Sequence, residues 1–294
     1  MTRFGRVLTA MITPFDHDGA LDLDGAAKLA SWLVEQGNEG LVIAGTTGES
    51  PTLTHEEQIE LVRTVCQAVS VPVIAGAGSN DTRAAIELTE QATAAGATAI
   101  LSVTPYYNRP SQAGLIAHYR AIASATHLPV MLYDIPVRTG RKVDTSTLLE
   151  LAHSVSNIVA VKDAAGNPAE TAALIASAPA GFEVYSGDDV LTLPLLSVGA
   201  VGVVSVAAHW AAAEIGEMID AFFAGDVQRA RELNAALIPS WQFQSGDPNP
   251  NPIPTKAMMK VLGRPGGDCR PPMGPEPDDL QNRARAVLAG LGRP

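Results

Sequence analysis

Short apolar runs recur along this chain, and their spacing constrains the fold more than any other feature of the sequence. Successive runs begin roughly 30 residues apart over the first six units, the length that a strand, a crossover helix and two loops require. The runs are rich in Val, Ile or Leu, and several lack polar alternation, which is typical of parallel strands covered on both faces. The eight predicted strands are 7–12, 41–44, 71–75, 99–103, 129–133, 158–161, 182–185 and 200–206.

Helical segments lie between these runs. Residues 24–36 place apolar side chains on one face, and Thr54 with Glu57 forms a capping box ahead of a second amphipathic segment. The other predicted cap residues are Asn167, Pro168 and Glu170 at a helix start, and Gly37 and Gly96 at helix ends. The sequence therefore predicts strands that alternate with crossover helices in an α/β fold.

Eight such units favour a closed (β/α)8 barrel, the TIM barrel architecture. An open, doubly wound sheet is the alternative, but that fold more often uses fewer strands and carries a Gly-rich turn after its first strand. Here the first strand runs into residues 13–16, Thr-Pro-Phe-Asp, which contain no glycine. The closed barrel is therefore the predicted fold.

The strand pattern stops at about residue 210, and the remaining chain is predicted to be helical. We expect residues 1–224 to form the barrel and residues 225–294 to form a helical C-terminal extension. Gly- and Pro-rich loops at 246–254 and 263–277 adjoin enough apolar helix to be ordered. The predicted helices of this part are 211–223, 226–237, 255–262 and 278–291.

Composition excludes several classes of protein. The 294 residues are 46% hydrophobic and 17% charged, which rules out disorder, collagen and a disulfide scaffold. The two cysteines, Cys66 and Cys269, have no partner at metal-ligand spacing, so a reducing cytoplasm fits best. The 31 acidic and 20 basic side chains give a formal charge of −11, which disfavours nucleic acid as a partner.

Secretion and membrane insertion are not indicated either. The apolar stretch 7–12 is too short for a signal sequence and runs into Pro14. No later run approaches the ~20 apolar residues that a membrane span needs. We therefore expect a cytoplasmic protein with no membrane partner.

Lys162 is the most informative residue at the strand ends, where barrel enzymes carry their chemistry. It directly follows the sixth apolar run and shares a pleat face with small Ala160, so its ammonium group is expected to point into the barrel. Partial desolvation there favours the neutral amine, which attacks a carbonyl and forms a Schiff base. The alternative is a lysine that pairs with Asp163 or another carboxylate and has no chemical function.

Hydroxyl groups gather at other strand ends. Thr46 and Thr47, flanked by glycines, offer two hydroxyls and backbone N–H groups to a small carboxylate, or form only a turn between strand and helix. Tyr106, Tyr107 and Tyr133 are candidates for a proton relay, or for packing at the strand ends.

Charged residues at the strand ends have less specific interpretations. Arg138 follows a Pro-containing loop and is a candidate to bind a carboxylate through two hydrogen bonds, or is a solvated arginine beside Asp134. Asp188 and Asp189 are adjacent acids of the kind that more commonly cap a helix, and no third ligand is spaced to help them bind a metal. The chain also lacks a complete dinucleotide loop and a P-loop, so no nucleotide cofactor is indicated. We therefore expect neither a metal nor a cofactor.

Five strand-end motifs, taken together, resemble the dihydrodipicolinate synthase family, part of a wider class of pyruvate-dependent Schiff-base lyases on the same barrel. The match spans about residues 6–262, and residues 248–254 are similar to that family's C-terminal loop. The motifs stand in the right order and at the right strand positions. They are residues 45–50, 104–110, 132–140, 161–163 and 186–189.

The resemblance implies a condensation of pyruvate with aspartate 4-semialdehyde, the branch point toward diaminopimelate and lysine. In that reaction Lys162 would form the Schiff base with the pyruvate keto carbon. Thr47 and its backbone would hold the pyruvate carboxylate, and Tyr133 would move protons together with Thr46 and Tyr107.

The resemblance also implies further substrate contacts and an oligomer. Arg138 would bind the carboxylate of the semialdehyde, the main chain of Val204 would face the imine, and Gly187 is expected to line the substrate site. The residue that matches Tyr107 enters from a neighbouring subunit in the family. This implies at least a dimer, and usually a homotetramer built as a dimer of dimers.

Feedback inhibition by lysine is a separate expectation. His55, Asn80 and Tyr106 match the family's allosteric pocket, but Gln58 and Ala84 stand where inhibited members typically have a second basic or polar residue and an acid. Without that acid the ammonium group of lysine loses its partner. We therefore expect weak or absent inhibition by lysine.

Two other functions remain open at this point. A pyruvate-forming sugar-acid aldolase of the same class would share the lysine and the second tyrosine, although the paired threonines and the Arg138 context favour the synthase. A barrel retained as a small-molecule binding protein without turnover is the other alternative. Intact Lys162, Tyr133 and Thr46 argue against it.

Overall fold

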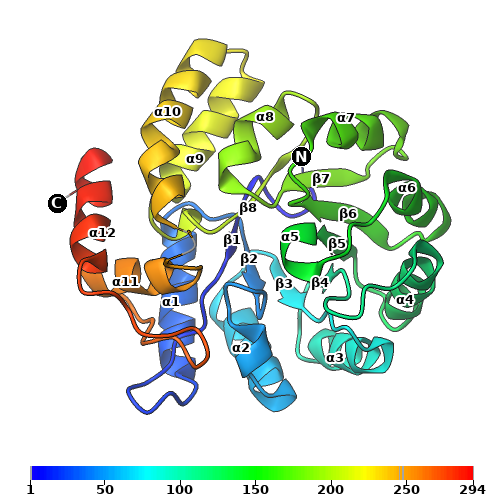
Figure 1. The fold of residues 1–294 in the computed structure, drawn as a ribbon, viewed down its shortest axis with the longest axis horizontal. Helices are drawn as coiled ribbons and strands as arrows, with labels where there is room; N and C mark the ends of the chain where they lie inside the picture. Colours follow the sequence, from blue (N-terminus) through cyan, green and yellow to red (C-terminus); the bar gives the residue numbers. More distant parts are fainter. Residues whose placement is uncertain (1, 245, 247, 294) are drawn as a thin grey trace.

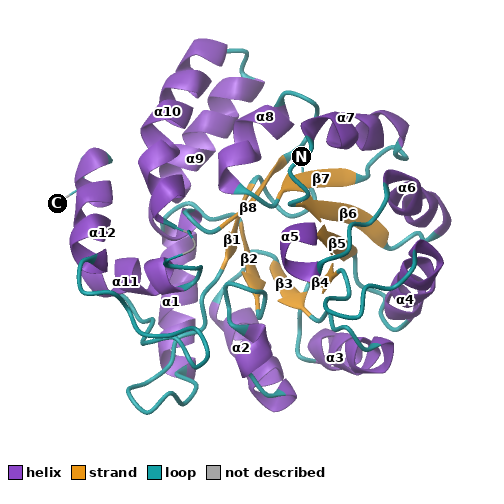
Figure 2. Ribbon diagram, in the orientation of Figure 1, coloured by secondary structure: helices purple, strands orange, loops and turns teal. Residues whose placement is uncertain are grey.

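The computed structural model describes residues 2–244, 246 and 248–293, and its parallel strands close into one barrel. Each strand pairs with the next in sequence and β8 pairs with β1, so the predicted (β/α)8 barrel is confirmed. Figures 1 and 2 show the helices as a ring around the strands. The strands are β1 (Val7–Ala10), β2 (Gly40–Ile43), β3 (Val73–Gly76), β4 (Ala99–Val103), β5 (Val130–Asp134), β6 (Ile158–Asp163), β7 (Glu183–Ser186) and β8 (Gly202–Ser205).

Helices connect successive strands and cover the outside of the barrel. Two of them, α5 and α8, have 4 and 5 residues, which is too short for apolar periodicity to identify them in a sequence. The helices are α1 (Leu23–Glu35), α2 (His55–Ala68), α3 (Thr82–Ala94), α4 (Gln112–Ser124), α5 (Pro136–Thr139), α6 (Thr145–Ser154), α7 (Pro168–Ser177), α8 (Thr192–Leu196), α9 (Ala208–Phe223), α10 (Val227–Phe243), α11 (Ile253–Val261) and α12 (Leu280–Gly290).

The predicted helix caps are confirmed where the structure gives their hydrogen bonds. At the start of α2 the Thr54 hydroxyl accepts from the Glu57 N–H at 3.2 Å, and the Glu57 carboxylate accepts from the Thr54 N–H at 2.9 Å. At the start of α7 the Asn167 side chain accepts from the Glu170 N–H at 3.3 Å. These local contacts fix where each helix begins, and hence where the strand-to-helix loops lie.

Apolar side chains form two layers. Inside the barrel, Leu8, Ile74, Met131 and Tyr185 pack together with the other inward-facing residues of the strands. A larger core lies between the strands and the surrounding helices. Both faces of each strand are therefore buried, which explains the near-continuous apolar runs of the sequence.

The sixth strand is longer than predicted. It was expected to end at residue 161, but β6 continues through Lys162 and Asp163. In the sheet register Lys162 is paired with Tyr133 of β5 and with Tyr185 of β7. Sheet pairing on both sides therefore fixes the backbone of Lys162.

All four C-terminal helices differ from their predicted bounds, α9 and α10 by more than two residues at one end and α11 and α12 by one or two residues at each end. Helix α9 begins at Ala208 rather than at residue 211, with a non-helical backbone at Ala211 where two helical segments meet. Helix α10 was predicted to end at residue 237, before Pro239, but it continues to Phe243. Burial of Ser240 and Trp241, with the Trp210 indole donating to the Ser240 hydroxyl at 3.1 Å, outweighs the helix-breaking tendency of proline.

Helices α11 and α12 pack against one another and against the preceding pair, α9 and α10. In Figure 1 they lie beside α1, at one side of the barrel. The loop after α11 returns to the segment that follows β1, where the Phe15 N–H donates to the Gly266 carbonyl at 3.2 Å. The division into domains at residue 224 stays a prediction. Within the described ranges, no helix is both long and apolar enough to cross a bilayer.

Candidate active site

Lys162 lies inside the barrel, where its side chain is 6% exposed. Its Nζ atom is 4.2 Å from the centroid of the Tyr133 ring. The neighbouring Asp163 points elsewhere, since its carboxylate accepts from the Thr171 hydroxyl at 2.6 Å and from the Ala165 N–H at 2.9 Å. The structure therefore places the amine among interior side chains rather than in an ion pair with Asp163.

Gly187, just after β7, provides the space for the Lys162 side chain. A Cβ atom at Gly187 would lie 2.9 Å from Lys162 Cγ and 2.9 Å from the Ala164 side chain, which is closer than packed carbon atoms approach. The Gly187 N–H donates to the Asp163 carbonyl at 2.7 Å, which fixes this backbone against β6. Gly187 was expected to line the substrate site, and the structure places it against the lysine.

The surroundings of Lys162 favour its neutral form. The pKa of Lys162 is lowered to about 8, mainly by burial and also by the positive charge of Arg138, while the negative charge of Asp189 opposes the shift. Because a neutral amine is the nucleophile that attacks a ketone, this environment suits imine formation.

Tyr133, the last residue but one of β5, is buried beside Lys162. Its carbonyl accepts from both the N–H and the hydroxyl of Thr104, each at 2.9 Å, and Tyr119 in turn donates to the Thr104 hydroxyl at 3.1 Å. Burial raises the pKa of Tyr133 to about 12, with Arg138 and the Thr46 hydroxyl opposing the rise. The phenol therefore keeps its proton at neutral pH and is a donor to a neighbouring oxygen.

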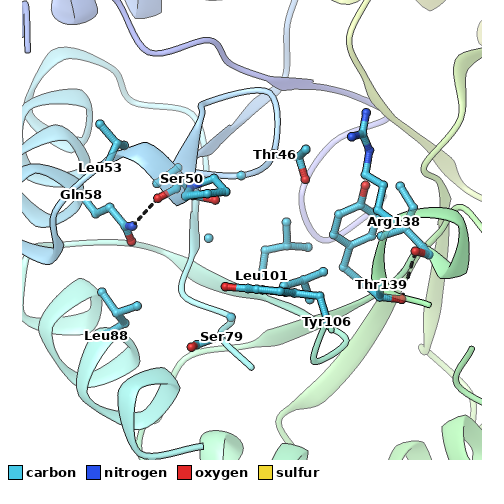
Figure 3. Close-up of a pocket in the computed structure, with 18 of the residues that line it drawn as sticks. Thr46, Ser50, Leu53, Gln58, Ser79, Leu88, Leu101, Tyr106, Arg138 and Thr139 are labelled. Atoms are coloured by element: carbon cyan, nitrogen blue, oxygen red, sulfur yellow. Dashed lines mark hydrogen bonds between the residues drawn. The ribbon is translucent and has the colours of Figure 1, made fainter. Parts of the chain in front are cut away.

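A cavity of about 400 Å³ opens beside Tyr133 (Figure 3). Its wall includes Thr46, Tyr106, Tyr133, Arg138 and His55, so the structure brings these predicted residues together. Lys162 is not itself part of the wall. Tyr133 joins the two regions, because it lines the cavity and its ring also contacts the Lys162 amine.

The loop that carries Thr46 and Thr47 follows β2 and is fixed by contacts from distant parts of the chain. The Thr13 hydroxyl, in the segment after β1, donates to the Gly48 carbonyl at 2.6 Å. The Asn251 amide donates to the Thr47 hydroxyl at 2.9 Å. Thr47 is buried, whereas Thr46 is half-buried and lines the cavity.

Arg138 lies in the short helix α5, directly after β5. Its side chain is exposed, and Figure 3 shows the guanidinium group directed toward the same side of the cavity as Thr46. The neighbouring Thr139 hydroxyl donates to the Ile135 and Arg141 carbonyls, at 3.1 and 2.8 Å. The carboxylate of Asp134, the partner considered for Arg138, instead accepts from the Val143 N–H at 3.1 Å.

Tyr107 lies apart from this group. Its side chain is 91% exposed, and its backbone has a φ of 73°, a left-handed conformation that is uncommon for a bulky residue. Asn80 and Asn108 fix the loop, since Asn80 donates to the Tyr106 carbonyl at 3.2 Å and Asn108 donates to the Asn80 carbonyl at 2.8 Å. Within one chain, therefore, Tyr107 does not join Lys162 and Tyr133.

The other predicted residues near strand ends are Val204, within β8, and the two acids after β7. Val204 is buried in the interior core of the barrel. Asp188 accepts from the Val190 N–H at 3.3 Å, and Asp189 accepts from the Val206 N–H at 2.9 Å and from the Ser205 hydroxyl. Both acids thus satisfy backbone and hydroxyl donors. In the described part of the chain, no group of three metal-ligating side chains is present.

The sequence did not predict which residues of the C-terminal part contact the loop that carries Thr46 and Thr47. Asn251 contacts Thr47, and Lys256 lies with its Nζ atom 2.7 Å from a Glu49 carboxylate oxygen. Residues 248–254 are similar to the family's C-terminal loop, but nothing local in them identifies a partner 204 residues away. Only the fold brings these two segments together.

Comparisons with known proteins agree with this geometry. The chain matches the Dihydrodipicolinate synthetase family over residues 3–290. A 4-hydroxy-tetrahydrodipicolinate synthase from Moorella thermoacetica is 51% identical over 292 residues, which cover 99% of each chain.

Two solved structures are also similar. A dihydrodipicolinate synthase from Bacillus anthracis has a TM-score of 0.94 and 43% identity, with 98% of this chain and 99% of the other covered. A dihydrodipicolinate synthase from Cyanidioschyzon merolae, solved with lysine bound, has a TM-score of 0.95 and 43% identity, with 99% of both chains covered.

Proposed function

This chain belongs to the dihydrodipicolinate synthetase family, and we propose from that premise how its residues carry out the reaction of a 4-hydroxy-tetrahydrodipicolinate synthase. The reaction condenses pyruvate with L-aspartate 4-semialdehyde. Relatives at about 50% identity bear this enzyme's name, which favours the synthase over the sugar-acid aldolase considered from the sequence. The observation that carries the proposed chemistry is the buried Lys162 amine against the Tyr133 ring.

The first step is attack by neutral Lys162 on the keto carbon of pyruvate. Loss of water gives an iminium ion, and loss of a methyl proton then gives an enamine, with the lysine nitrogen accepting the electron pair. The enamine carbon then attacks the aldehyde carbon of the semialdehyde, whose C=O π bond breaks as its oxygen takes up a proton, and the lysine iminium is regenerated. The lowered pKa of Lys162 supports this role, because the neutral amine is available near neutral pH.

Tyr133 moves protons to and from the reacting atoms, with Thr46 and Tyr107 as further members of the relay. The raised pKa of Tyr133 keeps its phenol protonated, so it donates to the oxygen that leaves as water. Thr46 lines the same cavity wall as Tyr133, which supports its membership of the relay.

The substrate carboxylates bind at two places. Thr47 and its backbone hold the pyruvate carboxylate, the main chain of Val204 faces the imine, and Gly187, which lies against Lys162, lines the substrate site. Arg138, the cation in the cavity wall, binds the carboxylate of the semialdehyde. Neither group requires a cofactor or a metal.

The exposed Tyr107 supports an oligomer. Tyr107 is 91% exposed, and a large aromatic side chain exposed to this extent is of the kind that a second subunit covers. We place Tyr107 in the relay of the neighbouring subunit, and the assembly as a homotetramer made of two dimers. Sedimentation equilibrium of the wild type and of Tyr107→Glu tests this arrangement. A wild-type monomer with full activity would contradict it.

Substrate profiling tests the function directly. We expect turnover of pyruvate with aspartate 4-semialdehyde, and no comparable cleavage of keto-deoxy sugar acids. Arg138→Ala should raise the KM for the semialdehyde by roughly 10-fold or more, because a charge-assisted hydrogen bond is lost, while Schiff-base formation with pyruvate is retained. Faster cleavage of a sugar acid than synthase turnover would reverse the assignment.

Inhibition by lysine should be weak or absent. His55, Gln58 and Tyr106 lie in the cavity wall, and Asn80 supports the Tyr106 backbone. The Gln58 amide donates to the Ser50 carbonyl at 3.0 Å (Figure 3), and the described residues of the wall include no carboxylate to bind the ammonium group of lysine. A steady-state assay that shows strong inhibition at low lysine concentration would overturn this expectation.

A further inference from the structure

Asn251, in the C-terminal part of the chain, contacts the loop that carries Thr46 and Thr47. Its Nδ2 atom donates to the Thr47 Oγ1 atom at 2.9 Å across 204 residues of sequence. Thr47 is 4% exposed and Asn251 is 7% exposed, so water competes little for this hydrogen bond.

A second hydrogen bond fixes which way the Asn251 amide faces. The hydroxyl of Thr255, a fully buried residue in the first turns of α11, donates to Asn251 Oδ1 at 3.3 Å. An amide oxygen accepts and an amide nitrogen donates, so this contact leaves the nitrogen to face Thr47. The three side chains form one ordered series from Thr255 through Asn251 to Thr47.

The direction of donation along this series of hydrogen bonds determines where the Thr47 hydroxyl proton points. A hydroxyl has one proton to donate and two lone pairs to accept with. Because Asn251 occupies a lone pair of Thr47 Oγ1, the Thr47 proton must point away from Asn251. The Thr47 hydroxyl is therefore a donor for a group on its other side.

We propose that Asn251 is a positioning residue, which turns the Thr47 hydroxyl so that it donates to the pyruvate carboxylate. The inference rests on the proposed function, in which Thr47 binds that carboxylate. It adds the C-terminal loop to the pyruvate site, as the part that sets the direction of a hydrogen bond.

Contacts beside this series hold Asn251 in place. Lys256, in the first turns of α11, has its Nζ atom 2.7 Å from a Glu49 carboxylate oxygen, and both side chains are almost fully buried. The other Glu49 oxygen accepts from the Arg270 N–H at 2.9 Å. The C-terminal part therefore contacts the 45–50 loop at two separate points, Thr47 and Glu49.

A mutant cycle tests whether Asn251 acts through Thr47. We expect Asn251→Ala to raise the KM for pyruvate roughly 10-fold and to leave kcat within about 3-fold, because one oriented hydrogen bond to a charged group is weakened. Thr47→Val should raise the KM at least as much. The double variant should match Thr47→Val alone, since Asn251 has no hydroxyl left to orient. If the rise in KM for the double variant equals the product of the two single-variant rises, the proposal is overturned.

Conservative variants separate orientation from mere packing. Asn251→Asp keeps the shape but presents only acceptors, so the Thr47 hydroxyl turns toward the new carboxylate, and the KM for pyruvate should rise roughly 100-fold. Asn249→Asp, in the same loop but in the outer groove beside Pro248 and Arg283, is the matched control and should change the KM less than about 2-fold. Equal KM values for Asn251→Asp and Asn251→Ala would contradict the proposal.

Thr255 provides a test that leaves Asn251 and Thr47 intact. Thr255→Val frees the amide to rotate and should raise the KM for pyruvate about 3-fold, whereas Thr255→Ser keeps the donor and should restore the wild-type value. Equal values for these two variants would also contradict the proposal. Borohydride trapping of pyruvate on wild-type Lys162 is run in parallel. If that adduct is absent, the proposed function itself has failed. If the adduct is present and the mutant cycle fails, only the role of Asn251 is contradicted.

Discussion

Individual residues in this site owe their chemistry to their surroundings, and Lys162 shows how. Burial and the charge of Arg138 favour the neutral amine, whereas Asp189 favours the ammonium form. With a pKa of about 8 instead of the ordinary 10.5, about a tenth of the amines are neutral at pH 7 rather than about three in ten thousand. Gly187 makes this possible, because any larger residue would displace the lysine side chain.

The sequence identifies Lys162 but not all of its neighbours. Strand alternation alone turns Lys162 to the same side as Ala160, so its inward direction is a local property. The contact between Asn251 and Thr47 depends on the path of the whole chain, and no local pattern carries it. Tyr107 is similar, since its local pattern does not show that it lies on the surface of one chain, and only the family resemblance implied a role in a neighbouring subunit.

The pKa of Lys162 predicts the pH dependence of the first step. Because only the neutral amine reacts, kcat/KM for pyruvate should rise with pH and level off above an apparent pKa of about 8 in the free enzyme. Stopped-flow or steady-state kinetics between about pH 6 and about pH 9.5 measures this profile. A flat profile across that range would mean that the amine is not the titrating nucleophile.

At the scale of elements, strands and caps follow from local sequence, whereas the C-terminal helices depend on tertiary contacts. The helix caps and most strand positions were predictable because their signals lie within a few residues of each other. Helix α10 passes through Pro239 because burial of Trp241 and Phe243 stabilises the last turns. Helix α11 is placed by Lys256, which contacts Glu49 in the loop after β2.

Lys256→Met tests how much this contact contributes to stability. The variant leaves the Glu49 carboxylate buried without its cation, so the free energy of unfolding should fall by about 3–5 kcal/mol. Adding Glu49→Gln should recover part of that loss, because the buried charge is removed. Lys28→Met, on α1, is the control and should change the free energy of unfolding by less than about 0.5 kcal/mol. Equal effects of the two lysine variants in urea unfolding would show that the buried pair contributes nothing.

At the scale of the whole molecule, the repeat of strand and helix was enough to predict a closed barrel. The shape of the cavity was not predictable, because its wall combines residues from loops after β2, β3, β4 and β5.

Buried ionisable groups throughout the fold also give the molecule its pH response. His118 and His209 are buried, with the pKa of each lowered to about 4, mainly by burial, while burial raises the pKa of Asp134 to about 6.

These groups predict a loss of stability in acid. The lowered pKa of each histidine means that the unfolded chain binds protons first, so their contribution is present above about pH 6.5 and is lost toward pH 4. The raised pKa of Asp134 acts in the opposite direction over about pH 4–6, but two histidines outweigh one carboxyl group.

Asp134→Asn separates the two contributions. The variant removes the cost of a buried charge, so its free energy of unfolding should exceed that of the wild type at about pH 7.5 and match it near pH 4. Its loss of stability on acidification should therefore be steeper. Urea unfolding at both pH values measures the difference. If the free energy of unfolding falls equally in the two proteins between these pH values, the assignment to Asp134 is contradicted.

The central claim is that Lys162 forms an imine with pyruvate, and chemical trapping tests it most directly. The protein is incubated with pyruvate and sodium borohydride, digested, and mapped by mass spectrometry, with Lys142→Ala and Lys162→Ala as control and test variants. The account predicts one reduced pyruvyl adduct on Lys162 in the wild type and in Lys142→Ala, and none in Lys162→Ala. An unmodified Lys162, or an adduct on another lysine, would contradict it.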